Sequence, residues 1–365
     1  MRLAVPVFCL LLVLFVPAGL HPDTLRLPAD SVAAMVLGGR PLCQVAEGSR
    51  FEWERGELQP LEGLFSFYAA GQQPLEARFE VSAAASRGEA LKGCFLFSEA
   101  VDRLNFTLQR DGEKTGASVR GFALDDAGRQ WCFLLGIPST AEAGEYFLQM
   151  RAYRDRRFIL YRTAVQIRFR SFQSEQIAFN QALSELLSKP DPRKVREYQD
   201  LLALLGTFHA RSVFHAGTLA VPVDSTRRTS GFADRRLYSY SDGGSSRSLH
   251  NGIDLAAPVG TPVFASGAGR VMLARERVIS GNSVVIEHLP GVFTLYYHLE
   301  NIDVQDGQRL YQGQRIGTVG MTGLATGPHL HWELRVGAVA VDPEVFVESP
   351  FIDKSLFSHN IMKRN

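Results

Sequence analysis

Cysteine is scarce in this chain, and net charge is nearly absent. The 365 residues include four cysteines, too few for a disulfide scaffold, so stability has to come from buried apolar surface. Lysine and arginine total 39 against 38 for aspartate and glutamate, and the resulting charge of +1 gives no electrostatic basis for binding nucleic acid. With 45% hydrophobic and 21% charged residues, the composition is that of a globular protein of two or three domains and excludes disordered, collagen-like and polytopic membrane classes.

The N-terminal apolar run is too short for a typical membrane span. It covers residues 3–16, between Arg2 and Pro17-Ala18-Gly19, whereas a spanning helix needs about 20 residues. A short apolar segment between a positive charge and small residues is typical of a secretory signal peptide. We therefore expect residues 1–20 to be a signal peptide and the protein to be exported, to the periplasm or the extracellular space. An uncleaved membrane anchor is the alternative.

Export would place the remaining cysteines, Cys43, Cys94 and Cys132, where disulfides persist. Cys94 and Cys132 lie in strand-like apolar segments and could be neighbours, but buried free thiols fit equally well. The sequence leaves this pairing open.

The fold expected for the whole chain is mainly β. Residues 27–170 contain short apolar runs separated by turn signals such as Gly38-Gly39, a pattern that predicts a β-sandwich. The segment 143–150, with Tyr146, resembles the tyrosine-corner strand of immunoglobulin-like domains, so we expect an immunoglobulin-like sandwich. Residues 214–346 contain a glycine-rich stretch. Of the 33 glycines, 14 lie between Gly243 and Gly327, which indicates tight turns in a second β domain. A C-terminal tail is expected at 347–365.

Helical periodicity is confined to residues 173–209, between the two β regions. Lys189-Pro190-Asp191-Pro192 supplies a helix stop, an N-cap candidate at Asp191 and a proline at the first helical position. We expect a helical hairpin linker that fixes the two β domains relative to each other. Its two apolar groups are Ile177, Leu183, Leu186 and Leu187, then Val195, Tyr198, Leu201, Leu202 and Leu205.

His250 and Asp254 lie four residues apart in the glycine-rich region. Asn251-Gly252 between them disfavours a helix, and in a straight strand the two Cα atoms would be about 13 Å apart. The chain must therefore bend at Asn251-Gly252 if both side chains are to bind one ion.

His329 and His331 are two residues apart, so a strand would place both imidazoles on one face. His250, Asp254 and His331 would then form a set of two histidines and one carboxylate. Three protein ligands with one open position are typical of a catalytic zinc site, where zinc lowers the pKa of water toward about 7. His298 and His329 would take and return protons and stabilise an oxyanion.

The order of these motifs resembles one known family. The resemblance is carried by residues 250–263, 281–286, 297–299, 313–317 and 322–333, and it extends over about 120 residues. These segments closely resemble lysostaphin/LytM-type zinc metallopeptidases, which cleave the peptides of peptidoglycan in bacterial cell walls. The resemblance implies Zn²⁺ held by His250, Asp254 and His331, with His298 and His329 as catalytic histidines.

Two positions depart from the family pattern. Ala233 stands where the family usually has glycine, and His288 lies in Glu287-His288-Leu289-Pro290-Gly291, where the family has an acidic-His-Gly run. Both departures bear on the shape of the substrate loops rather than on zinc binding, and we interpret His288 as structural.

The leading hypothesis is an exported zinc endopeptidase that hydrolyses peptide bonds in peptidoglycan. The alternative is a non-catalytic peptidoglycan-binding activator of another wall hydrolase, although such proteins typically lack part of the zinc set and this sequence has all of it. A third hypothesis is a latent enzyme whose groove is covered by the N-terminal domain or the hairpin. The N-terminal sandwich is expected to be a spacer or a module that binds the wall or a partner. The sequence leaves the cleaved bond and the oligomeric state open.

Overall fold

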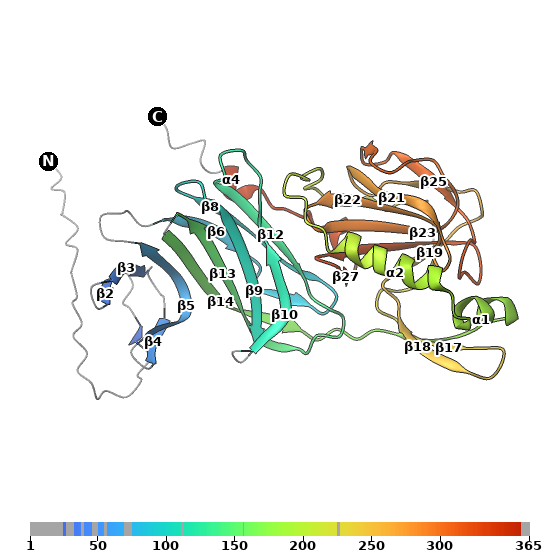
Figure 1. Cartoon of the computed structure of the whole chain (residues 1–365), viewed down its shortest axis with the longest axis horizontal. Coiled ribbons are helices and arrows are strands. Elements are labelled where there is room, and N and C mark those ends of the chain that lie inside the picture. Colours follow the sequence, from blue (N-terminus) through green and yellow to red (C-terminus); the bar gives the residue numbers. More distant parts are fainter. Residues whose placement is uncertain are drawn as a thin grey trace.

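The computed structural model shows a mainly β chain with four short helices among the residues it describes (Figure 1). These are residues 75–110, 113–155, 157–224 and 227–358, together with five strands nearer the N-terminus. The signal peptide expected at residues 1–20 lies outside the described residues. Within the described part of the chain, no helix combines the length and apolar character needed to cross a membrane. The five early strands are β1 (Leu25–Arg26), β2 (Ala33–Leu37), β3 (Arg40–Val45), β4 (Arg50–Glu54) and β5 (Glu57–Tyr68).

Two mainly antiparallel sheets of the N-terminal region pack face to face on a common core. Their other strands are β6 (Ala77–Val81), β7 (Ala84–Ser86), β8 (Ala90–Phe97), β9 (Arg103–Arg110), β10 (Glu113–Arg120), β11 (Phe122–Ala123), β12 (Gln130–Gly136), β13 (Gly144–Arg154) and β14 (Arg157–Arg168). The larger sheet has the order β1-β4-β5-β14-β13-β9-β10, with β2, β3 and β7 paired to its side, and the smaller has the order β11-β12-β8-β6. Phe106 of the larger sheet stacks on Phe133 of the smaller at 3.8 Å between ring centroids. Alternating burial along β13 directs Tyr146, Leu148 and Met150 into this core.

Cys94 and Cys132 form a disulfide between two neighbouring strands. They lie directly opposite each other on β8 and β12, with a Cα–Cα distance of 4.2 Å. Phe95 and Phe133, the next residues, point to the opposite face of the sheet, into the N-terminal core. The disulfide therefore lies on the outer face, which packs against the C-terminal region.

The connector between the two regions contains a strand as well as two helices: β15 (Ser174–Ala178), α1 (Gln181–Ser188) and α2 (Pro192–Leu205). Ile177 belongs to β15, so its predicted place on a helix is wrong. The reason is long-range: β15 pairs in parallel with a strand 61 residues further along the chain, and that pairing overrides the local periodicity. Asp191 is the N-cap of α2, where its Oδ1 accepts the Arg193 N–H at 2.8 Å.

The C-terminal region is built on one large sheet with a small sheet beside it. Its strands are β16 (Arg227–Ser230), β17 (Arg235–Ser239), β18 (Ser245–Leu249), β19 (Gly252–Ala256), β20 (Pro262–Phe264), β21 (Gly269–Arg277), β22 (Gly281–Leu289), β23 (Val292–Ile302), β24 (Arg309–Leu310), β25 (Arg315–Val319), β26 (His329–Val336) and β27 (Val339–Val341). The large sheet has the order β16-β19-β26-β23-β22-β21-β24, with β20, β25 and β27 paired to its side, and the small sheet has the order β15-β17-β18.

The central strands of the large sheet are buried on both faces. On β22, Val284 and Ile286 point into the main core, whereas Val285 points to the other face, where Leu201 and Leu205 of α2 cover it. Figure 1 shows α2 lying across this sheet beside β23. Because both faces are covered, burial does not alternate along these strands: all of β22 except Asn282, and β23 as far as Leu299, are buried.

The N-terminal and C-terminal regions share one apolar cluster. Cys94, Cys132 and Leu134 of the smaller N-terminal sheet belong to the same buried cluster as Trp332 of β26. Arg170 also pairs with the buried Asp342 at 2.6 Å, so polar and apolar contacts join the two regions.

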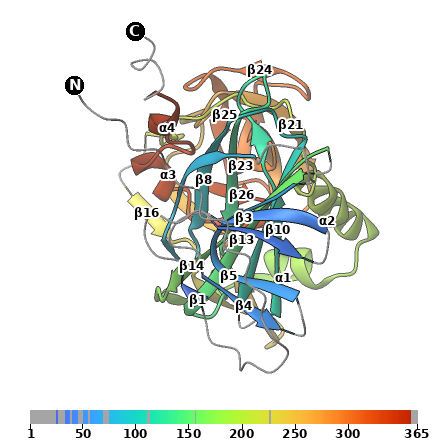
Figure 2. The same cartoon turned by 90° about the vertical axis from the view of Figure 1, so that its left-hand side faces the viewer.

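The chain after residue 347, expected to be a tail, packs against the N-terminal region as far as the structure describes it. Phe351 and Ile352 are buried, and Lys92 Nζ donates to Ser349 Oγ at 2.7 Å. Two short helices, α3 (Val345–Glu348) and α4 (Ser355–Ser358), flank this segment, and Figure 2 shows both near β8.

Candidate metal centre

Three of the predicted site residues are placed on one face by the pairing of β19 with β26. Asp254 lies opposite His331, and Ala256 lies opposite His329. Paired residues on antiparallel strands point to the same side of the sheet, so Asp254, His329 and His331 share one face.

His250 reaches this face through a bend. The chain leaves β18 at Leu249 and enters β19, in the other sheet, at Gly252, so the bend predicted at Asn251-Gly252 is present. The His250 N–H donates to the Asp234 carbonyl at 3.0 Å, which holds the bend. A Cβ at Gly252 would lie 2.3 Å from the Trp332 carbonyl oxygen, so the two strands can approach this closely only with glycine there.

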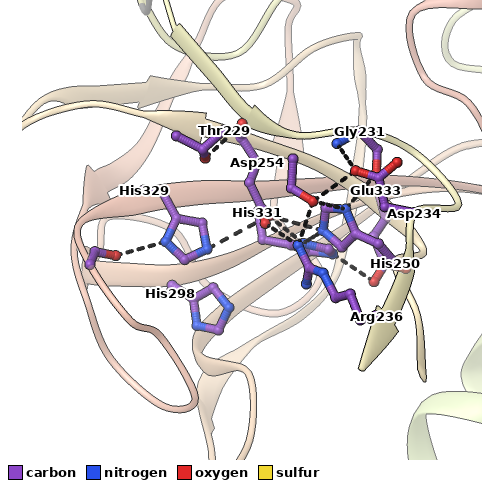
Figure 3. Close-up of polar contacts among 12 residues, drawn as sticks. Thr229, Gly231, Asp234, Arg236, His250, Asp254, His298, His329, His331 and Glu333 are labelled. Atoms are coloured by element: carbon purple, nitrogen blue, oxygen red, sulfur yellow. Dashed lines mark hydrogen bonds and ion pairs between the residues drawn. The ribbon is translucent and has the colours of Figure 1, made fainter. Parts of the chain in front are cut away.

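The donor atoms of His250, Asp254 and His331 converge on one point (Figure 3). His250 Nε2 lies 3.0 Å from Asp254 Oδ1 and 2.9 Å from His331 Nδ1, and His331 Nδ1 lies 2.8 Å from Asp254 Oδ1. All three residues are buried.

The hydrogen bonds around the cluster assign the tautomers of the two imidazoles. His250 Nδ1 lies 2.7 Å from the Gly231 carbonyl oxygen, which can only accept, so Nδ1 carries the hydrogen and Nε2 has a lone pair. His331 Nε2 donates in the same way to Glu333 Oε1 at 2.9 Å, which leaves a lone pair on Nδ1 of the neutral ring. Two nitrogen lone pairs and a carboxylate oxygen therefore face one another.

The electrostatics of the cluster favour positive charge at this point. Burial raises the pKa of Asp254, but hydrogen bonds with His250 and His331 outweigh burial and leave the pKa well below its usual range. Burial lowers the pKa of His331, but Asp254 and Glu333 outweigh it and raise the pKa to about 9. Either a proton or a metal ion can supply the required positive charge, and a bound metal displaces the proton.

The donor set fits a divalent metal ion. Tetrahedral sites of two histidines and one carboxylate have ligand bonds of about 2.0–2.2 Å, which places the ligand atoms about 3.3 Å apart, so the separations here need only a small expansion. The groups that hydrogen-bond to the second nitrogen of each imidazole, a backbone carbonyl and the Glu333 carboxylate, also match such a site. Arg335 donates to Glu333 Oε2 at 2.7 Å. Burial raises the pKa of Glu333, but Arg335 and His331 together outweigh burial and lower the pKa to about 2.

His298 lies beside the cluster, at a backbone irregularity. Its φ of 61° is in the left-handed region, and the pairing of β22 with β23 shifts register between Val284–Tyr296 and Asn282–Leu299, on either side of it. Bulges of this kind re-aim side chains next to active sites. His298 Nδ1 donates to the Thr322 carbonyl at 2.8 Å, so Nε2 is unprotonated. Burial, then the charges of neighbouring histidines, lower the pKa of His298 to about 3.

His329 is the most exposed of the five predicted site residues, with 15% of its side chain exposed. Its Nδ1 donates to the Gly327 carbonyl at 2.8 Å, and its Nε2 lies 3.6 Å from Asp254 Oδ1. Its ring centroid is 4.9 Å from that of His298. The two rings therefore lie next to each other beside the cluster, as Figure 3 shows.

Comparison with known proteins adds a family to this geometry. Residues 248–343 match the profile of peptidase family M23, and this range contains all five predicted site residues. The chain carries an M23 peptidase domain.

Curated relatives match the M23 domain over part of their length. The peptidoglycan DD-endopeptidase ShyA of Vibrio cholerae is 48% identical over 116 residues, 32% of this chain and 26% of the relative. The DD-carboxypeptidase/endopeptidase Mpg of Neisseria meningitidis is 44% identical over 114 residues, 30% of this chain and 26% of the relative. The matched region thus spans about a quarter of either relative. The catalytic domain of the antimicrobial peptidase lysostaphin from Staphylococcus simulans is 29% identical, with a TM-score of 0.30 over 34% of this chain and 92% of that one.

Sequence reasoning missed the residues that hold the ligands of the M23 domain in place. Glu333 carried a usable signal, because it is two residues after His331 and a strand directs both to the same face. Arg236 carried none. Its Nη2 donates to Asp254 Oδ2 at 2.7 Å from β17, a strand of the small sheet, and no spacing in the sequence indicates that contact.

His288 lies away from the metal centre, in a buried network of its own. Its Nδ1 is 2.8 Å from the Ala268 carbonyl oxygen, and its Nε2 is 2.7 Å from Thr294 Oγ1. Complete burial lowers the pKa of His288 to about 4.

Proposed function

We propose that this protein is a zinc-dependent endopeptidase that hydrolyses peptide bonds in peptidoglycan. The observation that carries the proposal is the convergence of two imidazole nitrogens and one carboxylate oxygen, from His250, His331 and Asp254, within 3.0 Å of one another. The names of the curated relatives, DD-endopeptidase and DD-carboxypeptidase/endopeptidase, support peptidoglycan peptides as the substrate.

The residues of the chain divide the chemistry between them. His250, Asp254 and His331 would hold the zinc ion, which supplies Lewis acidity and lowers the pKa of water toward about 7. In the neutral ring of both His298 and His329 the lone pair is on Nε2, because each Nδ1 donates to a backbone carbonyl. These two rings would take a proton from the attacking water, stabilise the oxyanion and return the proton to the leaving amine.

We further propose that the substrate bond is the D,D-peptide cross-link between neighbouring stem peptides. ShyA and Mpg differ in whether their names include carboxypeptidase activity, but both names specify D,D-peptide bonds. The degree of cross-linking in the wall would then be the property that the enzyme controls.

The location and the role of the N-terminal region complete the proposal. Export is supported by the Cys94–Cys132 disulfide, since disulfides persist in oxidising compartments, and by the apolar run at residues 3–16. An immunoglobulin-like sandwich is supported by Tyr146, whose hydroxyl donates to the Glu142 carbonyl at 3.0 Å in the manner of a tyrosine corner. We propose that this sandwich acts as a spacer or as a module that binds the wall or a partner.

Clearing of purified sacculi tests the enzymatic part of the proposal. We expect the zinc-loaded protein to solubilise sacculi, the chelated protein to lose this activity and added Zn²⁺ to restore it. His331→Ala should reduce the rate by at least 10³-fold, because the metal loses a ligand and Asp254 loses its neighbour. His215→Ala is the matched control, since the His215 ring lies 2.8 Å from the Thr218 carbonyl oxygen and packs against the rings of His288 and Phe351 rather than against the metal ligands. Full activity in His331→Ala would exclude this mechanism.

A further inference from the structure

The connector strand β15 contributes a side chain to the surroundings of the metal centre. Glu175 lies on β15 directly opposite Arg236 of β17, so both side chains point to the same face of the small sheet. Arg236 in turn donates to Asp254 Oδ2 at 2.7 Å. We propose that Glu175 is a positioning residue, which holds the Asp254 carboxylate in its ligating orientation through Arg236.

The contacts that carry this proposal form a closed network around Arg236. Its Nε contacts Glu175 Oε1, and its Nη2 contacts Ser230 Oγ at 2.8 Å as well as Asp254 Oδ2. Ser230 Oγ also donates to Glu175 Oε1 at 2.8 Å. Glu175 therefore fixes the guanidinium on two sides. Since Asp254 Oδ1 faces the two imidazoles, the hydrogen bond to Oδ2 sets the rotation of the carboxylate.

Charge makes Glu175 necessary for Arg236 to act in this way. Arg236 is 13% exposed and Glu175 is 28% exposed, so water screens their interaction only in part. Without Glu175, the guanidinium would rely on Asp254 for compensation of its positive charge, next to a site that binds a cation. That charge would compete for Asp254 and oppose metal binding.

Backbone pairing keeps β15 in place. Its register with β17 runs from Ser174 opposite Arg235 to Ala178 opposite Ser239. The Phe179 N–H continues the pairing to the Ser239 carbonyl at 2.9 Å, and its ring stacks on Tyr238 at 4.8 Å between centroids. The residue that compensates Arg236 is thus supplied by the connector, outside the residues that match the M23 profile.

The affinity of the full-length protein for Zn²⁺ tests the proposal. We expect Glu175→Gln, which removes the charge and keeps the shape, to weaken Zn²⁺ binding about 10-fold in competition with a chromophoric chelator. Glu185→Gln is the matched control: Glu185 pairs with Lys189 on the surface of α1 in the same connector, and its loss should leave the affinity unchanged. The visible spectrum of the Co²⁺-substituted protein should also change in Glu175→Gln, because the ligand field reports the position of Asp254.

A double-mutant cycle tests whether Glu175 acts through Arg236. In an Arg236→Met background, which removes both the contact to Asp254 and the positive charge, Glu175→Gln should change the Zn²⁺ affinity less than twofold. Unchanged affinity and an unchanged Co²⁺ spectrum in Glu175→Gln, or fully additive effects in the cycle, would overturn the proposal.

Two further comparisons keep the result interpretable. If Glu175→Gln does not fold, Glu175→Asp retains the charge with a shorter reach and should still weaken binding; wild-type affinity in that variant would contradict the proposal. The inference rests on the proposed function only for the presence of a metal. If the Zn²⁺ affinity depends on Glu175 but the zinc-loaded protein leaves peptidoglycan intact, the proposed function is refuted and the inference is not.

Discussion

The five side chains at the metal centre are distinguished by what lies behind each of them. His250 and His331 are oriented by a carbonyl and a carboxylate, Asp254 by a guanidinium, and His298 and His329 by carbonyls. The ligand set and its one-face arrangement could be predicted, because a period of two and a bend are local properties of the chain. The supporting groups could not, apart from Glu333, because Arg236 reaches Asp254 from another sheet and Glu175 reaches Arg236 through a strand pairing of long sequence separation.

The buried His288 predicts a pH dependence of stability. Its pKa is about 4 in the folded protein and 6.5 in the unfolded chain, so between these values the unfolded chain binds a proton that the folded protein does not. Stability is therefore lost as the pH falls from 6.5 to 4, by about 3 kcal/mol for this residue.

Urea unfolding at several pH values measures this dependence. His288→Asn should change the free energy of unfolding at every pH. It should also make the plot of this free energy against pH less steep between pH 6.5 and 4, by the equivalent of about one bound proton. Parallel slopes in the two proteins would show that His288 is not responsible.

At the scale of elements, the M23 domain depends on segments outside its own sequence. Helix α2 covers part of the same sheet face that carries the metal centre, where Tyr297 packs beside Leu205 and stacks on His331 at 5.4 Å between centroids. The existence of this helix follows from periodicity and from the Asp191 cap. Its predicted apolar face is only partly right, because Leu201 and Leu205 are buried whereas Val195, Tyr198 and Leu202 are exposed. The position of Ile177 in β15 does not, because a parallel partner distant in sequence determines it.

The turn between β7 and β8 contacts Phe232, in the segment before the M23 match, and gives a testable prediction. Gly88 has a φ of +83°, and a Cβ there would lie 2.4 Å from Cε1 of the buried Phe232. Gly243 has a φ of +87° with no atom within 4 Å of a Cβ. Gly243→Ala should cost about 1 kcal/mol from backbone strain alone, and Gly88→Ala about 1–3 kcal/mol more, because Phe232 has to move.

Thermal unfolding and Zn²⁺ titration of both variants check this prediction. Gly88→Ala should also weaken metal binding, because Phe232 follows Gly231, whose carbonyl orients His250. Equal destabilisation of the two variants would mean that the contact between Gly88 and Phe232 does not support the site.

At the scale of the whole molecule, the N-terminal region and the M23 domain are joined by one apolar cluster and by the Arg170–Asp342 pair, and helix α2 of the connector packs on the M23 domain through a second cluster. The sequence indicated a mainly β chain with three parts, but the contacts between the parts depend on surfaces that local patterns do not encode. Latency through a covered groove stays a prediction. A chain starting near Phe214 would be a poor test of it, since that truncation removes Glu175 and α2 together with any cover.

The central claim is that a metal held by His250, Asp254 and His331 serves to hydrolyse peptide bonds in peptidoglycan. Mass spectrometry of the muropeptides left after digestion of defined sacculi tests it most directly. With zinc-loaded protein, we expect cross-linked dimers to decrease and monomers to increase, with one water added for each bond cleaved. Chelated protein and His331→Ala should leave the dimers intact. Dimers that persist with the zinc-loaded protein, or that disappear equally with the chelated protein, would contradict the account.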